Sequence, residues 1–188
     1  LWSNKEHRTV KGLNIVSLNY SYCYTDMMLD FSINYNKNQI VNVNENYFHH
    51  KSNAYKRRVE GNDGKNNLAL QMVNRVLKSG IYADYLLVDS WYAKPNFIYK
   101  IKEKGIDVIA RLSKSNRIWQ FIGKFKTLES IYNQVNNQKT SKLGNYNSIK
   151  YTYVSTTTTH KTLGRVKIVF IKTKDNLIPI ISTNTNLS

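Results

Sequence analysis

Hydrophobic and polar positions change their period several times along the chain, and each change predicts a different element. Residues 13–22 and 26–35 mix β-branched, aromatic and apolar side chains, which is typical of strands. A tight turn at residues 23–25 would join these strands into an antiparallel hairpin. The next stretch, 36–62, is polar and has no sustained period, so we predict a surface loop there.

Helical spacing replaces the strand pattern after residue 64. Apolar residues in 65–80 recur three and four positions apart, which predicts an amphipathic helix. A short apolar stretch at 83–90 predicts a buried strand, and 94–105 predicts a second helix with Pro95 in its first turn. Residues 106–113 predict another strand. A strand, a helix and a strand at this spacing form a βαβ unit, with parallel strands and a right-handed crossover.

The rest of the chain is rich in β-branched and aromatic residues. The segment IWQFIGKFKTLESIYNQV begins with a strand pattern and ends with at least one helical turn. Residues 148–176 predict a hairpin that turns near Gly164, and 177–183 predict a last short strand. The predicted order is therefore two strands, then alternating helices and strands, then mainly strands, which defines a mixed α/β chain.

Composition narrows the class of protein. The chain has 188 residues, of which 41% are hydrophobic, enough for one domain with a buried core or for one domain with an insertion. We expect no membrane association, because no apolar stretch approaches the about 18–20 residues that span a bilayer and residues 1–12 lack a secretory apolar segment. The single cysteine, Cys23, excludes an internal disulfide and a cysteine-based zinc cage, and it fits a reducing cytoplasm.

Charge is the strongest feature of the composition. Lysine and arginine total 28 and aspartate and glutamate total 12, so the formal net charge is +16. A surface this positive attracts polyanions, and nucleic acid is the first candidate. Asparagine is also abundant, and joint enrichment in lysine and asparagine can follow from an AT-rich genome. Charge alone therefore leaves nucleic-acid contact and compositional bias both open.

Asp89 is the main candidate for chemistry. It ends the apolar stretch LLVD, and ligands of open α/β sheets bind beyond the carboxyl ends of parallel strands. We expect a half-buried, rigidly held carboxylate, which suits a Mg²⁺ ligand and, in a basic chain, phosphodiester chemistry with two metal ions. The alternative is that Asp89 caps the helix that follows, because aspartate is a good N-cap residue and Pro95 marks a helix start.

Basic and aromatic residues gather after Asp89. Between residues 94 and 126 there are nine basic residues and two acidic ones, and aromatic side chains are interspersed among them. Lysines and arginines pair with phosphates, and aromatic rings stack on unpaired bases. On helix 94–105 the apolar residues are better explained as a buried face. For Arg111, Lys114 and Arg117, at the end of the 106–113 strand, we favour phosphate contact. The predicted DNA-binding residues are Trp91, Tyr92, Lys94, Arg111, Lys114 and Arg117.

Other candidate groups are weaker. His49 and His50 lie in a polar stretch without an acidic residue at ligand spacing, and His7 and His160 are isolated. The sequence contains no phosphate-binding glycine loop and no arrangement typical of a serine hydrolase.

The stretch around Asp89 resembles a known family. YLLVDSWYAKPNFIYKIKEKGIDVIARLSKS is similar to the second-aspartate region of the DDE transposases of bacterial insertion sequences, in the group named for insertion sequence four. Members show an apolar strand, then Asp-Ser-Trp-Phe/Tyr, then a helix that contains proline, then a G..VIAR.K pattern. Looser matches are HRTVKGLNIVSLNYS near the start, the later KTLESIY, and the terminal IISTN.NLS, so the resemblance covers most of the chain.

The resemblance implies a fold and a reaction. The fold is ribonuclease H-like, a mixed sheet with flanking helices: a core over 1–113, a mainly β insertion over 114–176 and a return strand over 177–188. The reaction is Mg²⁺-dependent phosphoryl transfer, with Mn²⁺ as a substitute ion. Water frees a 3′ hydroxyl at the transposon end, and that hydroxyl attacks target DNA. Asp89 is then the second of three metal-binding carboxylates, and the complete protein acts as a homodimer on paired ends.

The chain also departs from the family pattern. In relatives the first aspartate precedes the block that matches 7–21 and the glutamate follows the terminal IIST block, so we expect both outside this chain and a fold incomplete at both ends. Asn176 stands where many relatives have tryptophan. With one of three carboxylates, the chain alone should not cleave DNA. The alternative function is a catalytically dead, transposase-derived remnant that binds DNA.

Overall fold

The chain adopts a mixed α/β fold. The computed structural model describes residues 2–3, 7–9, 12–35, 49–113, 118–138, 141–147 and 149–187. It divides into two compact units, Leu1–Tyr82 and Ala83–Ser188, and each is described by itself. The predicted fold class is confirmed: a mixed sheet is flanked by helices, as in a ribonuclease H-like fold. None of the helices in the described ranges is both long enough and apolar enough to cross a membrane.

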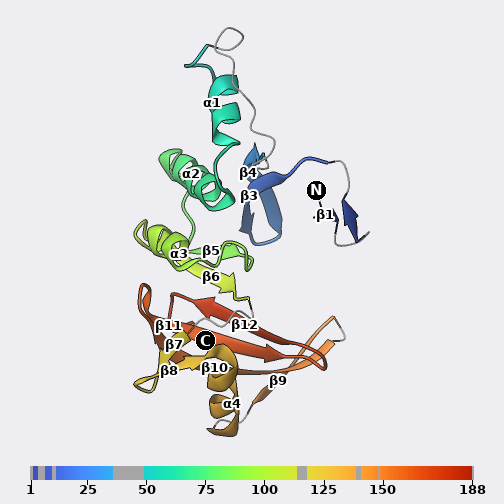
Figure 1. Cartoon of the computed structure of the whole chain (residues 1–188), viewed down its shortest axis with the longest axis vertical. Helices are drawn as coiled ribbons and strands as arrows, with labels where there is room; N and C mark the ends of the chain where they lie inside the picture. Colours follow the sequence, from blue (N-terminus) through green and yellow to red (C-terminus); the bar gives the residue numbers. More distant parts are fainter. Residues whose placement is uncertain are drawn as a thin grey trace. The chain divides into compact units, whose positions relative to one another are not determined.

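The first unit is built on a hairpin. Its elements are β1 (Trp2–Ser3), β2 (Arg8–Thr9), β3 (Ile15–Tyr22), β4 (Thr25–Ile33), α1 (Asn53–Glu60) and α2 (Lys65–Lys78) (Figure 1). The predicted hairpin is confirmed, because β3 and β4 pair antiparallel. Cys23 has a φ of 52° in the turn between them. A β-bulge interrupts the register at Leu18/Asn19.

Helix α1 corrects the loop prediction for 36–62. Residues 36–48 lie outside the described residues, but Asn53–Glu60 is helical. Ser52 caps this helix, because its side-chain oxygen accepts a hydrogen bond from the Tyr55 amide. The only residue of α1 that is buried is the acidic Glu60, so this helix has no buried apolar stripe from which the sequence could predict it.

Helix α2 packs on one face of the hairpin and carries most of the unit's core. Leu68, Met72 and Val73 are buried on α2, and Val16 is buried on β3. Apolar residues at this spacing form one helical stripe, which explains why the sequence predicts this helix correctly. The helix ends next to a glycine: Gly80 has a φ of 79° just past the Ser79 C-cap.

The second unit is an eight-stranded mixed sheet with two helices. Its elements are β5 (Tyr85–Val88), α3 (Pro95–Lys102), β6 (Asp107–Arg111), β7 (Ile118–Phe121), β8 (Lys124–Thr127), α4 (Leu128–Gln138), β9 (Lys142–Tyr146), β10 (Ile149–His160), β11 (Gly164–Lys172) and β12 (Leu177–Ser182). The strand order is β5-β6-β12-β11-β10-β7-β8, and β9 pairs with β10 (Figure 1).

Pairing in this sheet confirms the predicted units. Strands β5 and β6 are parallel and α3 connects them in sequence, which is the expected βαβ unit. Strands β10 and β11 form the expected hairpin, in which Gly164 has a φ of 70°. Strand β12 lies between β6 and β11 and pairs antiparallel with both. The boundaries at 113 and 176, between core, insertion and return strand, remain predictions.

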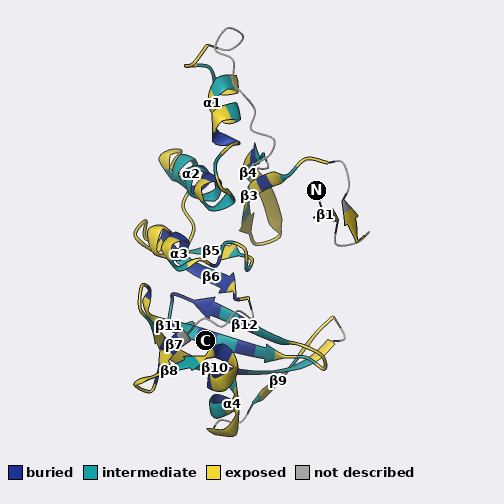
Figure 2. Ribbon diagram, viewed as in Figure 1, coloured by how far each residue is buried: buried dark blue, intermediate teal, exposed yellow. Residues whose placement is uncertain are grey.

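Both helices of this unit cover the same face of the sheet. Helix α3 packs on β6, where Ala110 is buried, and register places Ala110 beside Ile181 and Ile181 beside Ile168. Phe170 lies two residues further along β11 on the same side, and its ring contacts that of Tyr132 on α4. Figure 2 shows buried residues along β6, β12 and β11 in the middle of the sheet. The face turned away from α3 and α4 bears the more exposed side chains, such as Leu87 and Arg165.

Candidate functional site

Asp89 is the first residue after β5. Because β5 and β6 run parallel, their carboxyl ends lie at the same edge of the sheet, the edge at which open α/β sheets bind ligands. Register pairs Val88 with Ala110, and the next residues along the two strands are Asp89 and Arg111. The fold therefore places a carboxylate and a guanidinium at neighbouring strand ends.

A tight turn holds Asp89. Its Oδ1 accepts a hydrogen bond from the Trp91 amide at 2.8 Å, and its carbonyl accepts one from the Tyr92 amide at 3.2 Å. This is an Asx-type turn, which aspartate favours. The interpretation of Asp89 as a helix cap is wrong, because α3 begins at Pro95 and Lys94 occupies the N-cap position. The turn uses Oδ1 of a carboxylate that has about four acceptor positions.

Asp89 is more exposed than the sequence predicts. We expected a half-buried carboxylate, but the residue is exposed, as is Leu87 on the strand before it. The reason is topological: β5 is the last strand of the sheet, with β6 as its sole partner among the described residues, and Asp89 stands one residue beyond the strand. The carboxylate is therefore held by its turn rather than by burial.

Tyr92 anchors the turn on α3. Its ring lies 6.0 Å from the ring of Phe97, which is buried. Burial raises the pKa of the Tyr92 hydroxyl above its usual value, and the negative charge of Asp89 raises it further. Both effects disfavour the phenolate, so Tyr92 is a neutral hydrogen-bonding group over the physiological pH range.

The other predicted DNA-binding residues are placed as follows. Trp91 is 59% exposed, and Lys94 and Arg111 are exposed. Lys114 and Arg117 lie outside the described residues. The structure thus brings Asp89, Trp91, Tyr92 and Lys94 into one turn, with Arg111 at the end of the adjacent strand.

The aromatic residues further along the chain divide into two groups. Trp119 and Phe121 are buried, and the ring of Trp119 lies 4.8 Å from that of His160. These two side chains belong to the core and are not available to stack on bases. Phe125 is 75% exposed, so its ring remains available to stack on an unpaired base.

A cluster of four charged side chains in the first unit was missed by the sequence prediction. Asp30 and Glu60 are buried carboxylates, and both pair with Arg75: Nη2 lies 2.7 Å from Asp30 Oδ2 and 2.9 Å from Glu60 Oε1. Arg57 adds a contact of 2.9 Å to Asp30 Oδ1 and one of 3.4 Å to Glu60 Oε2. We call these four residues the charge cluster.

The charge cluster joins three elements, because Asp30 lies on β4, Arg57 and Glu60 on α1, and Arg75 on α2. Burial alone would lower the pKa of the Arg75 guanidinium, but its hydrogen bonds to Glu60 and Asp30 raise that pKa above its usual value. Asp30 and Arg75 are 45 positions apart, so no local pattern in the sequence predicts their contact. The carboxylates of Asp30 and Glu60 are paired with arginines and are not free for a metal ion.

The described residues do not make a complete metal site. No group of three histidine, cysteine, aspartate or glutamate side chains among them could hold an ion. Asp89 supplies one carboxylate, whose Oδ2 is unpaired in the described part of the chain, whereas a two-metal centre needs several such ligands. Within the described ranges, Asp89 can therefore be one ligand of such a centre but not the centre itself.

The parallel strand end, its exposed aspartate and the basic residues around it define the class: an α/β protein whose site suits phosphodiester chemistry on nucleic acid. Comparison with known protein families points to the same class of protein. The family model described as DDE superfamily endonuclease matches residues 1–128, more than half of the chain, so the chain belongs to this family. The family supports a nuclease or transposase class of enzyme, implies DNA as substrate, and generally uses divalent metal ions. No curated protein sequence matches the chain.

Proposed function

We propose that this chain is part of a DNA transposase catalytic domain, which binds transposon ends and carries out Mg²⁺-dependent cleavage and strand transfer. One observation carries the proposal: Asp89 follows a parallel strand at its carboxyl end, inside the region that matches the endonuclease family. An exposed carboxylate whose Oδ2 has no hydrogen-bond partner among the described residues is what a divalent ion shared with a DNA phosphate would need.

The residues that the sequence predicts to bind DNA have distinct proposed roles. Lys94, Arg111, Lys114 and Arg117 supply positive charge for DNA phosphates, and such contacts position a nucleic acid without reading its sequence. Trp91, which is largely exposed, offers a ring to a base or sugar next to the reacting phosphate. Tyr92 packs on Phe97 and holds the backbone of the turn, so that Asp89 and Trp91 keep a fixed spacing.

The rest of the assembly follows from the same proposal. Further carboxylates must join Asp89 to hold the ions, and Mg²⁺, with Mn²⁺ as a substitute, is the metal we propose. We also propose a homodimer that brings two transposon ends together, and a cytoplasmic location, in keeping with a single free cysteine.

The experiment uses the protein encoded by the full reading frame. We expect Asp89→Asn to leave DNA binding within about twofold and to lower the rate of Mg²⁺-dependent cleavage by at least about 10³-fold, because a carboxylate that holds the metal is replaced by a neutral amide. Cleavage is measured on supercoiled plasmid that carries the transposon ends, with Mg²⁺ and with a chelator. Asp84→Asn is the matched control, since Asp84 is an exposed acid just before the other end of β5. Equal cleavage rates for Asp89→Asn and Asp84→Asn would show that Asp89 is not a metal ligand.

A second candidate function is DNA binding without cleavage, as in a decayed transposase. The incomplete set of carboxylates in the described residues favours it. DNA affinity measured against salt, with and without Mg²⁺, separates the two. Both functions predict a steep salt dependence, and a metal-dependent gain in affinity or any cleavage favours the enzyme. Steep salt dependence without either result favours the binding protein.

A further inference from the structure

The face of the large sheet that α3 and α4 leave uncovered carries a transverse row of polar and aromatic side chains. Register sets Phe125 on β8 beside Gln120 on β7, Gln120 beside Thr159 on β10, and Thr159 beside Arg165 on β11. All four residues are exposed. Partners in register point to the same side of a sheet, so the row crosses four strands on one face.

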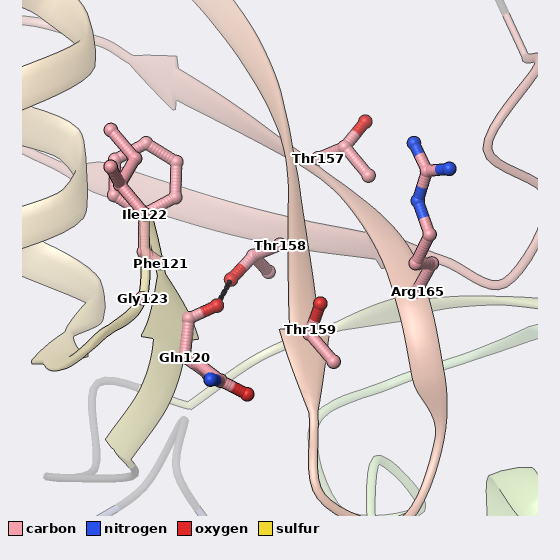
Figure 3. Close-up of a pocket in the computed structure, with 8 residues that line it drawn as sticks. All are labelled: Gln120, Phe121, Ile122, Gly123, Thr157, Thr158, Thr159 and Arg165. Atoms are coloured by element: carbon pink, nitrogen blue, oxygen red, sulfur yellow. Dashed lines mark hydrogen bonds between the residues drawn. The ribbon is translucent and has the colours of Figure 1, made fainter.

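A hollow lies beside this row. It has a volume of about 290 Å³ and is lined by Gln120, Phe121, Ile122, Gly123, Thr157, Thr158, Thr159 and Arg165 (Figure 3). One water takes about 30 Å³ in the liquid, so the hollow has room for a phosphate group together with water. In Figure 3 the side chains of Thr157 and Arg165 extend from neighbouring strands next to it.

The strand pairing explains why the hollow exists. Strand β7 pairs with β10 at a single position, Gln120 with Thr159, and the chain then turns through Ile122 and Gly123, which have φ values of 49° and 69°. On the same edge of β10, β9 pairs with residues 149–153. Residues 154–158 are thus left without a strand partner on that edge in the described part of the chain. The Thr158 hydroxyl donates to the Gln120 carbonyl at 2.6 Å and fixes the width at one end.

The charge of these strands has one sign. The sequence ranges 118–127 and 149–172 together contain seven basic residues and no aspartate or glutamate. Arg165 therefore has no acidic neighbour on any of these strands to neutralise it. The hydroxyls of Thr157 and Thr159 stand next to it as further donors. A guanidinium with adjacent hydroxyl donors suits a phosphate, because an arginine can present two parallel N–H groups to its oxygens.

We propose that this hollow is a phosphate subsite for the DNA backbone, in which Arg165 supplies the charge and Thr157 and Thr159 supply hydroxyl donors. The subsite rests on the proposed DNA-binding function and extends it to a face distant in sequence from Asp89. The contact positions the strand without reading bases, since none of these groups needs a base edge. Exposed Phe125, in the same row, gives the neighbouring nucleotide a ring on which to lie.

The test compares Arg165→Gln with Lys172→Gln in the full chain. Both residues are exposed cations on β11, but Lys172 lies at the far end of the strand from the hollow. Affinity for a short labelled DNA duplex of random sequence is measured by anisotropy over a series of salt concentrations. We expect Arg165→Gln to weaken binding by about 5–20-fold and to reduce the salt slope by about 1, and Lys172→Gln to change both less.

Thr159→Val supplies a second measurement with the charge unchanged. Valine keeps the shape and strand preference of threonine but removes the hydroxyl. We expect a loss of about 2–5-fold in affinity with the salt slope unaltered, as for one hydrogen bond. Circular dichroism and thermal unfolding show whether each variant is folded.

Two results would overturn the subsite. If the wild-type chain binds DNA but Arg165→Gln matches Lys172→Gln in affinity and slope, and Thr159→Val matches the wild type, the subsite fails while the proposed DNA-binding function stands. If the wild-type chain shows no salt-dependent DNA binding, the proposed function fails and the subsite with it.

Discussion

Two carboxylates of the first unit and one carboxylate of the second are held in opposite ways. In the first unit, Asp30 and Glu60 are buried and are paired with arginines on two helices. In the second, Asp89 is exposed, and its side chain accepts a hydrogen bond from a backbone amide in its own turn. A carboxylate that is saturated by arginines contributes to structure, whereas one held by its backbone with an oxygen to spare can take a ligand. The contrast separates two buried, ion-paired carboxylates from one exposed carboxylate.

Removing Arg75 should have the largest effect on stability. Arg75→Met would leave Asp30 and Glu60 buried without their main partner, so we expect a loss of about 2–4 kcal/mol in the free energy of unfolding. Chemical denaturation followed by circular dichroism measures it. Lys78→Met, at the exposed end of the same helix, is the control and should cost less than about 0.5 kcal/mol. Similar values for the two variants would mean that the charge cluster does not hold α2 in place.

The approach of α1 to β4 can be tested at Gly61. A methyl group at this position would lie 2.6 Å from the carbonyl oxygen of Ile33 and 2.5 Å from the ring of Tyr35. The backbone oxygen cannot rotate away, so Gly61→Ala should move the end of α1 and with it Glu60. We expect a loss of about 1–3 kcal/mol in unfolding free energy. Gly64→Ala is the control, because nothing lies within 4 Å of its added methyl group. A neutral Gly61→Ala would show that the backbones do not meet so closely.

Asp89 should tolerate a change that keeps its turn. Asparagine can accept the Trp91 amide as aspartate does, so Asp89→Asn should change the free energy of unfolding by less than about 0.5 kcal/mol. Asp89→Ala loses that acceptor and should cost about 1 kcal/mol. Thermal unfolding ranks the two variants. Strong destabilisation by Asp89→Asn would make the acid structural, like Asp30, and would remove the contrast between the units.

The smallest expected effect is on the titration of Tyr92. Its pKa is raised by burial and by the charge of Asp89, so Asp89→Asn should lower it part of the way toward the usual value. Because the folded pKa is the higher one, the stabilising contribution is fully present below the pKa of the unfolded chain and is lost as the pH rises through the folded pKa. Carbon NMR of labelled tyrosine, assigned by Tyr92→Phe, measures the shift. An unchanged Tyr92 pKa in Asp89→Asn would show that the charge of Asp89 does not act on the Tyr92 hydroxyl.

Several elements could be predicted because their signals are local. Helices α2 and α3 have an apolar stripe at helical spacing, and the βαβ unit and the two main hairpins follow from alternation and turn residues. Helix α1 could not be predicted in this way, since its buried residue is an acid whose partner, Arg75, lies on another helix. Strand β9 was not predicted either, because Leu143, Tyr146 and the lysine that begins it are exposed.

The candidate site also has features that the sequence predicts and features that depend on tertiary packing. The sequence alone placed Asp89 after an apolar strand and surrounded it with basic residues, because strand patterns and composition are properties of neighbours along the chain. The exposure of Asp89 depended on the place of β5 in the strand order, and the Trp119 ring is buried in the core. The row from Phe125 to Arg165 arose from the register between four strands. Burial, ion pairing and the alignment of distant strands depend on contacts between residues far apart in sequence. They are decided when the chain packs, and no local pattern encodes them.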